Sequence, residues 1–188
     1  MCVFPLVGSN QLTSTTLGSL SELVNLRHLD LEDNPITDWP DFTSVASQAP
    51  DNERTLKLDY NPSLPMTYTP TYCHFHTVSM KACGFTQYPD LESCWGNSNT
   101  KLKKLVLAGN SITEFPYGVL AKVAVLELSG NKISQLDPWK MNRALCENPG
   151  LTELDLSDND FESIAERPDL CHHGQSTELI LKGVSPCL

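Results

Sequence analysis

Leucine and other apolar residues alternate with polar ones in short stretches that recur along the chain, and each stretch ends at an asparagine. Leu26, Leu29 and Leu31 precede Asn34, and Ile36 follows it by two places. The same spacing recurs before three more asparagines, Asn110, Asn131 and Asn159. Apolar and polar residues that alternate over a few positions predict a short β-strand with one buried and one solvated face. Each stretch is therefore expected to be one strand followed by a turn.

Four weaker copies fit the same frame, with the asparagine place held by Asn10, Asn61, Cys83 and Val184. The steps between the eight anchors are 24, 27, 22, 27, 21, 28 and 25 residues, with a mean of about 25. A period of ~20 to 29 residues with this spacing predicts a solenoid of stacked repeats. No single repeat has a core of its own, since each buries its leucines only against its neighbours. We therefore expect residues 1–188 to be a single repeat domain that belongs to a longer chain or an assembly.

The recurring asparagine is expected to be buried in the turn. Its side-chain amide can bond the backbone groups that the turn leaves unpaired, and stacked copies then form a ladder. Cys83 takes this place in one repeat, where a small residue with a weak donor can substitute. We therefore predict that Cys83 is a buried free thiol.

The segments that return from one strand to the next differ between repeats. Asp137 and Pro138 followed by residues 139–146 predict a helix with Asp137 as its N-cap and Pro138 in its first turn. Leu17, Leu20 and Leu23, spaced by three, predict a second short helix. Elsewhere the returns are rich in X-Pro steps, which favour turns and extended pieces. We expect a low and uneven helical content.

The composition is acidic, with 13 Lys and Arg against 23 Asp and Glu and a net charge of −10. This balance argues against a nucleic-acid backbone or an anionic membrane as the partner. No apolar run approaches the ~18 residues of a membrane span, and residues 1–7 are too short and uncharged for a signal peptide. If the protein is secreted, its targeting segment is not present in this chain.

The cysteines predict two cross-links between neighbouring repeats. Cys73 lies 12 residues past its anchor and Cys94 lies 11 past the next, while Cys146 and Cys171 lie 15 and 12 past theirs. We predict disulfides between Cys73 and Cys94 and between Cys146 and Cys171, each worth ~3 kcal/mol. They imply an oxidising, extracellular compartment. Two alternatives remain, a Cys171–Cys187 closure that leaves Cys146 free, and a cytosolic protein with reduced thiols.

Two groups of cysteine and histidine are candidate metal ligands, namely Cys73 with His74 and His76, and Cys171 with His172 and His173. Neither has the paired short spacings of a structural zinc site, so solvated histidines beside disulfides are the favoured interpretation. The chain also lacks a nucleophile elbow, a phosphate-binding glycine loop and a zincin helix. We therefore expect no metal, no cofactor and no enzymatic activity.

The LxxLxLxxNxL copies resemble those of the leucine-rich-repeat superfamily over residues 2 to about 184. The resemblance implies an α/β solenoid of about eight repeats, curved, with a parallel β-sheet on its concave face and irregular loops and short helices on its convex face. Cysteine-containing versions are similar to extracellular receptor ectodomains and secreted adhesion or matrix proteins. The motif is specific for the fold and hardly specific for the function.

The repeat frame predicts which side chains face the concave groove. They are the non-leucine places of the strands, and the predicted binding residues among them are Asp30, Glu32, Lys57, Asp59, Tyr60, Lys81, Lys104, Val106, Val125, Glu127, Glu153 and Asp155. Carboxylates gather towards both ends of this series, and lysines and small apolar residues gather in its middle. Such a groove suits a partner with basic termini. A solvated sheet face that binds nothing would have a similar composition, because exposed strand positions are commonly charged.

We favour a non-enzymatic extracellular recognition module that binds a protein or peptide partner on its concave face. The alternative is a structural building block of an extracellular fibre, coat or matrix, in contact with copies of itself or neighbouring subunits. It is motivated by the ends of the solenoid, because a terminal repeat without a polar cap exposes core leucines unless something covers them.

Overall fold

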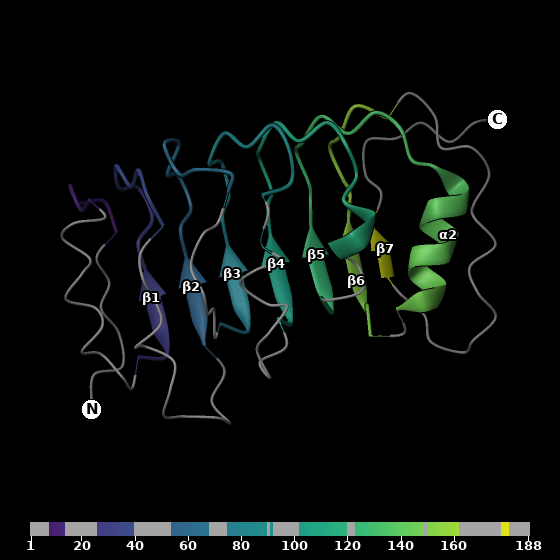
Figure 1. The fold of residues 1–188 in the computed structure, drawn as a ribbon, viewed down its shortest axis with the longest axis horizontal. Coiled ribbons are helices and arrows are strands. Elements are labelled where there is room, and N and C mark those ends of the chain that lie inside the picture. The colour runs from purple at the N-terminus through teal and green to yellow at the C-terminus, as the bar shows by residue number, and fades with distance from the viewer. Residues whose placement is uncertain are drawn as a thin grey trace.

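Seven short parallel strands form one sheet along the solenoid (Figure 1). The computed structural model of the chain describes residues 8–13, 26–39, 54–67, 75–89, 91, 102–119, 123–148, 150–161 and 178–180. The strands are β1 (His28–Asp30), β2 (Thr55–Lys57), β3 (Thr77–Ser79), β4 (Lys104–Val106), β5 (Val125–Glu127), β6 (Glu153–Asp155) and β7 (Glu178–Ile180). Their order in the sheet is their order in the chain. Each repeat therefore adds one strand beside the last, as the repeat spacing predicts.

The strand register aligns equivalent places of successive repeats. The middle residue of each strand pairs with that of the next, in the series Leu29, Leu56, Val78, Leu105, Leu126, Leu154 and Leu179. The first six of these side chains are at most 2% exposed. Because side chains alternate along a strand, the first and third positions point away from the core.

Further rows of apolar side chains lie behind the strand ladder in one continuous core. One row lies two places after the ladder residues and consists of Leu31, Leu58, Met80, Leu107, Leu128 and Leu156, all buried. A second row lies beyond the turn and includes Ile36, Phe85, Ile112, Ile133 and Phe161. Each of these repeats contributes one residue to the first row, and all but the β2 repeat, where Ser63 is exposed, contribute one to the second. The core is therefore continuous only through contacts between repeats.

The asparagine side chains bind neighbouring repeats together at the turns. Asn110 Nδ2 donates to the carbonyl oxygens of Leu107 in its own repeat and Met80 in the repeat before, each at 2.9 Å. Its Oδ1 accepts the N–H groups of Cys83 at 2.9 Å and Phe85 at 3.1 Å. Asn131 and Asn159 make the corresponding Nδ2 bonds, and their Oδ1 atoms accept the N–H groups of Ile112 and Ile133, each at 3.0 Å. The predicted asparagine ladder is therefore present in this part of the chain.

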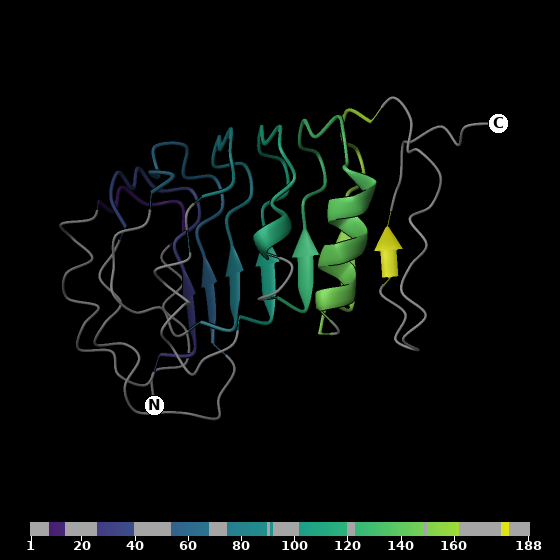
Figure 2. The ribbon, with the colours of Figure 1, turned by 45° about the vertical axis from the view of Figure 1, so that its right-hand side comes forward.

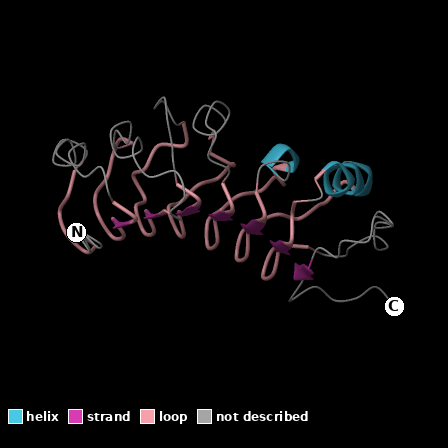
Figure 3. Ribbon diagram, turned by 90° about the horizontal axis from the view of Figure 1, so that it is seen from below, coloured by secondary structure: helices cyan, strands magenta, loops and turns pink. Residues whose placement is uncertain are grey.

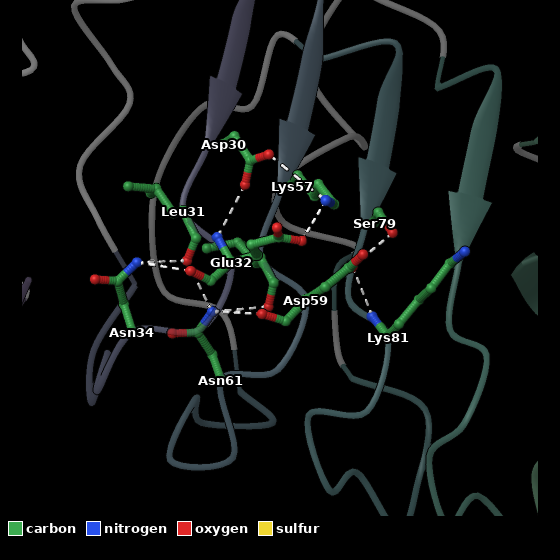
Figure 4. Close-up of polar contacts among 10 residues, drawn as sticks. Asp30, Leu31, Glu32, Asn34, Lys57, Asp59, Asn61, Ser79 and Lys81 are labelled. Carbon is green, nitrogen blue, oxygen red and sulfur yellow. Dashed lines mark hydrogen bonds and ion pairs between the residues drawn. The ribbon is translucent and has the colours of Figure 1, made fainter. Parts of the chain in front are cut away.

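Two members of the ladder differ from this pattern. Asn61 Nδ2 donates to the carbonyl oxygens of Leu31, Leu58 and Asp59 (Figure 4), but its Oδ1 is buried without a partner. Cys83 takes the asparagine place as a buried free thiol, and its Sγ donates to the Leu58 carbonyl at 3.2 Å. Burial raises the pKa of this thiol to about 11. Cys83 therefore donates a hydrogen bond to a carbonyl oxygen of the repeat before, as an asparagine does. It has no side-chain oxygen with which to accept an N–H group of that repeat.

The described helices lie on the side of the core opposite the strands (Figure 3). They are η2 (Tyr117–Val119) and α2 (Pro138–Glu147), which lie side by side (Figure 2). The Asp137 carboxylate accepts the N–H groups of Trp139 and Lys140, so the predicted helix and its N-cap are confirmed. The Asp137 N–H in turn donates to the Tyr117 hydroxyl at 2.6 Å, which joins the two helices.

Several predictions about the fold remain predictions. The helix expected at residues 17–23 lies outside the described residues, and the number of repeats, the curvature and the single domain over residues 1–188 are expectations from the sequence. In the described ranges, no helix has the length and apolar character needed to cross a bilayer.

Candidate binding surfaces

The first and third positions of the strands form a surface that we call the open sheet face. In β1 to β6 these positions are His28, Asp30, Thr55, Lys57, Thr77, Ser79, Lys104, Val106, Val125, Glu127, Glu153 and Asp155. Seven of the twelve predicted binding residues lie there and are half-buried, namely Asp30, Lys57, Lys104, Val125, Glu127, Glu153 and Asp155. Glu32 and Lys81, also half-buried, follow directly after β1 and β3. The strand frame therefore brings most of the predicted residues to one surface.

Ion pairs across the strands neutralise part of this surface. The Lys57 ammonium contacts the carboxylates of Glu32 and Asp30, the latter at 3.5 Å between Nζ and Oδ2 (Figure 4). The hydrogen bond that Lys57 donates to the Glu32 carboxylate raises the pKa of Lys57, so the lysine stays charged throughout the physiological range. Lys104 pairs with Glu127 in the adjacent strand β5. The basic centre predicted for the groove is thus largely engaged in contacts within the chain.

Of the charged predicted binding residues that are half-buried, three have no ion pair with another described residue. The backbone N–H of Lys81 donates a hydrogen bond to the Asp59 carboxylate, but the Lys81 ammonium pairs with no described carboxylate. Glu153 and Asp155, the outward residues of β6, likewise have no described cationic partner, although Asp155 accepts the Ser157 N–H at 2.9 Å. Unpaired negative charge on the open sheet face is therefore concentrated at β6.

Two predicted binding residues are buried instead of exposed. Asp59 is 3% exposed, and its carboxylate accepts the Ser79 hydroxyl at 2.6 Å and the Lys81 N–H at 2.9 Å. Val106 is also 3% exposed and lies between its register partners Ser79 and Glu127. The expectation that both side chains are available in the groove is wrong, because neighbouring strands supply the groups that enclose them.

Tyr60 does not belong to the open sheet face either. It follows β2 by three residues and lies in the turn, where its backbone φ is 58° and its side chain is 56% exposed. Its N–H donates to the Lys81 carbonyl at 2.8 Å, which joins the turn to the next repeat. Tyr60 therefore does not occupy a strand position of the open sheet face, because the left-handed backbone takes the residue out of the strand alternation.

The comparison with protein families finds three segments of this solenoid. The family described as "Leucine Rich repeat" matches residues 23–38, 98–114 and 147–163, which contain β1, β4 and β6 with the turn after each strand. These three matches support membership of the chain in the leucine-rich-repeat superfamily. No curated protein matches the chain. Domains of this superfamily commonly mediate protein–protein interactions and are generally non-enzymatic binding modules.

Every described turn of these leucine-rich repeats has a left-handed residue directly before the asparagine place. These residues are Ser9, Asp33, Tyr60, Ala82, Gly109, Gly130 and Asp158, with φ between 51° and 68°. We call this series the turn row. Its backbone N–H groups donate to carbonyl oxygens in the next repeat, as in Gly109 to Ser129 at 2.8 Å. The sequence signal was the glycine before Asn110 and before Asn131, which marks a place that needs positive φ.

The cysteines and histidines of these leucine-rich repeats are only partly described. Cys146 is disulfide-bonded, but the partners proposed from the repeat frame, Cys171 for this residue and Cys73 with Cys94, lie outside the described residues. His76 Nδ1 accepts the Arg54 N–H at 3.2 Å. The other candidate metal ligands are likewise outside the described ranges, and those ranges hold no cluster of three or more ligating side chains.

Proposed function

We propose that this leucine-rich-repeat domain is a non-enzymatic recognition module whose open sheet face binds a basic segment of a protein or peptide. The observation that carries this proposal is the pair of carboxylates on β6. Glu153 and Asp155 are half-buried and have no described cationic partner. The carboxylates of Asp30, Glu32 and Glu127, in contrast, are already neutralised by Lys57 and Lys104.

Lysine and arginine side chains suit this arrangement for physical reasons. Charge-assisted hydrogen bonds to a carboxylate are about twice as strong as neutral ones, and partial burial weakens the screening of the charge by solvent. The chain also has a net charge of −10, which attracts a basic partner over a longer range and raises its association rate. The open sheet face therefore supports both the encounter and the docking of a cationic segment.

Selection from a random peptide library displayed on phage tests the proposal while the natural partner is unidentified. Peptides selected on the wild-type chain should be enriched in lysine and arginine, and their affinity should fall by about tenfold or more in the variant Glu153→Lys with Asp155→Lys. Asp30 and Glu32 are left unchanged, because reversing their charge would also release Lys57.

A matched control reverses two charges on another surface. Glu114→Lys with Asp160→Lys changes the net charge by the same amount at two exposed positions, one before η2 and one in the turn after β6. This variant should keep the affinity of the wild-type chain. If both double variants weaken the peptides equally, the net charge explains the effect and the open sheet face is not the binding surface.

We also propose an extracellular location, which the disulfide at Cys146 supports, because such bonds persist in oxidising compartments. Peptide mapping of the native protein without reductant should recover Cys146 linked to Cys171 and Cys73 linked to Cys94. Alkylation of both Cys73 and Cys94 in the native protein would refute the second pair and weaken the extracellular assignment.

The alternative role as a building block of a fibre, coat or matrix depends on the two ends of the solenoid. Residues 1–7 and 181–188 lie outside the described ranges, so this role rests on the sequence pattern alone. Light scattering separates the two functions, since a strictly monomeric chain at high concentration would contradict the assembly role and leave the recognition role intact.

A further inference from the structure

The first three described turns line an open pocket at the edge of the sheet. Residues 9–11 and 33–35, together with Tyr60, Pro62 and Ser63, form a solvent-open depression with a volume of about 730 Å³. This volume lies within the ~300–1,000 Å³ of typical small-molecule sites. The lining residues come from turns and not from strand positions. This edge pocket is therefore a different surface from the open sheet face.

Tyr60 is the residue of the edge pocket that the fold itself does not explain. The same place in later repeats holds Ala82, Gly109, Gly130 and Asp158, all smaller than tyrosine, and glycine and aspartate are among the residues that adopt a left-handed backbone most readily. A bulky side chain at φ 58° is a rare and strained choice. The ring is also 56% exposed, so packing in the core does not compensate for the strain. A strained backbone that presents an aromatic ring to solvent points to a use for that ring.

Apart from Pro35 and Pro62, the remaining lining side chains are polar, and none of them carries a positive charge. Ser9 and Ser63 supply hydroxyls, Asn10 and Gln11 supply amides, and Asp33 supplies a carboxylate. Hydroxyls and amides both donate and accept hydrogen bonds, whereas the carboxylate accepts only. Asp33 disfavours phosphate and other anions in the pocket, since like charges repel. The lining thus suits an uncharged ligand that is rich in groups able to donate and accept.

Saccharides have this combination of properties. One face of a pyranose ring carries C–H groups that can stack on an aromatic ring, and its hydroxyls donate and accept hydrogen bonds around the rim. A polyproline segment would also pack on an aromatic ring, but its prolines carry no amide N–H or hydroxyl for the Asp33 carboxylate. We propose that the edge pocket binds an uncharged saccharide, with the Tyr60 ring as its stacking platform and Asp33 accepting hydrogen bonds from its hydroxyls.

Titration of the isotope-labelled chain with uncharged oligosaccharides, followed by NMR, tests this assignment. The probes are maltotriose, cellotriose, mannotriose and N,N′,N″-triacetylchitotriose, each up to ~10 mM, a range that detects millimolar affinity. At least one should shift the amide signals of residues 9–11, 33–35 and 60–63 in a saturable way. Tyr60→Gly should weaken that binding by about tenfold or more.

Tyr60→Gly is expected to leave the fold unchanged, because glycine holds the same place in two later turns, at Gly109 and Gly130. Asp158→Gly is the matched control, since it removes a side chain from the same backbone place in a turn outside the pocket. This control should bind the saccharide as tightly as the wild-type chain does. Equal binding by Tyr60→Gly would overturn the role of the ring.

Three further outcomes would overturn the assignment of the ligand. They are the absence of saturable shifts with all four oligosaccharides, shifts confined to the open sheet face, and binding at this pocket of a decaproline peptide but of no saccharide. The Glu153→Lys with Asp155→Lys variant should keep saccharide binding. A failure of the peptide selection on the open sheet face is therefore distinguishable from a failure here.

Discussion

Replacing Asn110 with alanine should produce one of the largest losses of stability available from a single polar side chain in this chain. The side chain is 5% exposed and makes four hydrogen bonds of 2.9 to 3.1 Å to backbone groups of two repeats. At a net ~1 kcal/mol for each bond, the loss is about 4 kcal/mol, and the buried groups left without partners act in the same direction. The global stability of a domain is only about 5–15 kcal/mol, so this loss is a large fraction of it.

Urea denaturation followed by circular dichroism measures this effect. With a slope of ~2 kcal/mol per molar urea, the midpoint for Asn110→Ala should fall by roughly 2 M. Asn10→Ala is the matched control, because Asn10 holds the same motif place but is exposed, and its loss should not exceed about 1.5 kcal/mol. Similar midpoints for the two variants would refute the argument that burial of the ladder bonds determines their contribution.

Three smaller effects follow from other contacts. Burial raises the pKa of Cys83 from its ordinary value of 9.0 to about 11, so the unfolded chain loses this proton first and stability should fall between pH 9 and 11 by roughly 2–3 kcal/mol. Comparison of urea midpoints across that pH range should show a smaller fall in Cys83→Ala, and an equal fall would contradict this origin. Asp137→Ala removes the N-cap of α2 and should lower the free energy of unfolding by about 1 kcal/mol, whereas Asp137→Ser should keep most of it. Hydrogen exchange checks this, since the amides in the first turn of α2 should exchange faster in Asp137→Ala. Lys57→Met should cost less than about 1 kcal/mol in the same urea assay, and less still at high salt, because its ion pairs are partly solvated; a loss above ~2 kcal/mol would show that these pairs are better shielded than their exposure indicates.

The repeat pattern predicted the fold in some detail because one rule governs every repeat. The leucine spacing located the middle residue of each strand, and Asp137 with Pro138 marked the start of α2. Both signals are local, since strand alternation and helix capping depend on residues only a few places apart. Each segment therefore carries them by itself, whatever its partners in other repeats are.

The composition of the binding surface was harder to predict, because it depends on contacts between strands. Asp59 looked like an exposed strand residue, but Ser79 and Lys81 of the next repeat bond its carboxylate. Val106 looked available, but its register partners enclose it. Lys57 looked like a free cation until the register placed it opposite Asp30. In each case the deciding neighbour lies more than 19 residues away in the chain.

By itself, the sequence determined that the chain stacks its repeats into a parallel sheet, because no single repeat can bury its leucines alone. It also determined which place in each repeat enters the core and which place forms the ladder. Only the tertiary structure decided which charges on the open sheet face remain unpaired, and that Tyr60 lines an edge pocket with Ser9 and Asp33. The physical reason is that burial follows the periodicity of one segment, whereas charge pairing and pocket shape follow the register between segments.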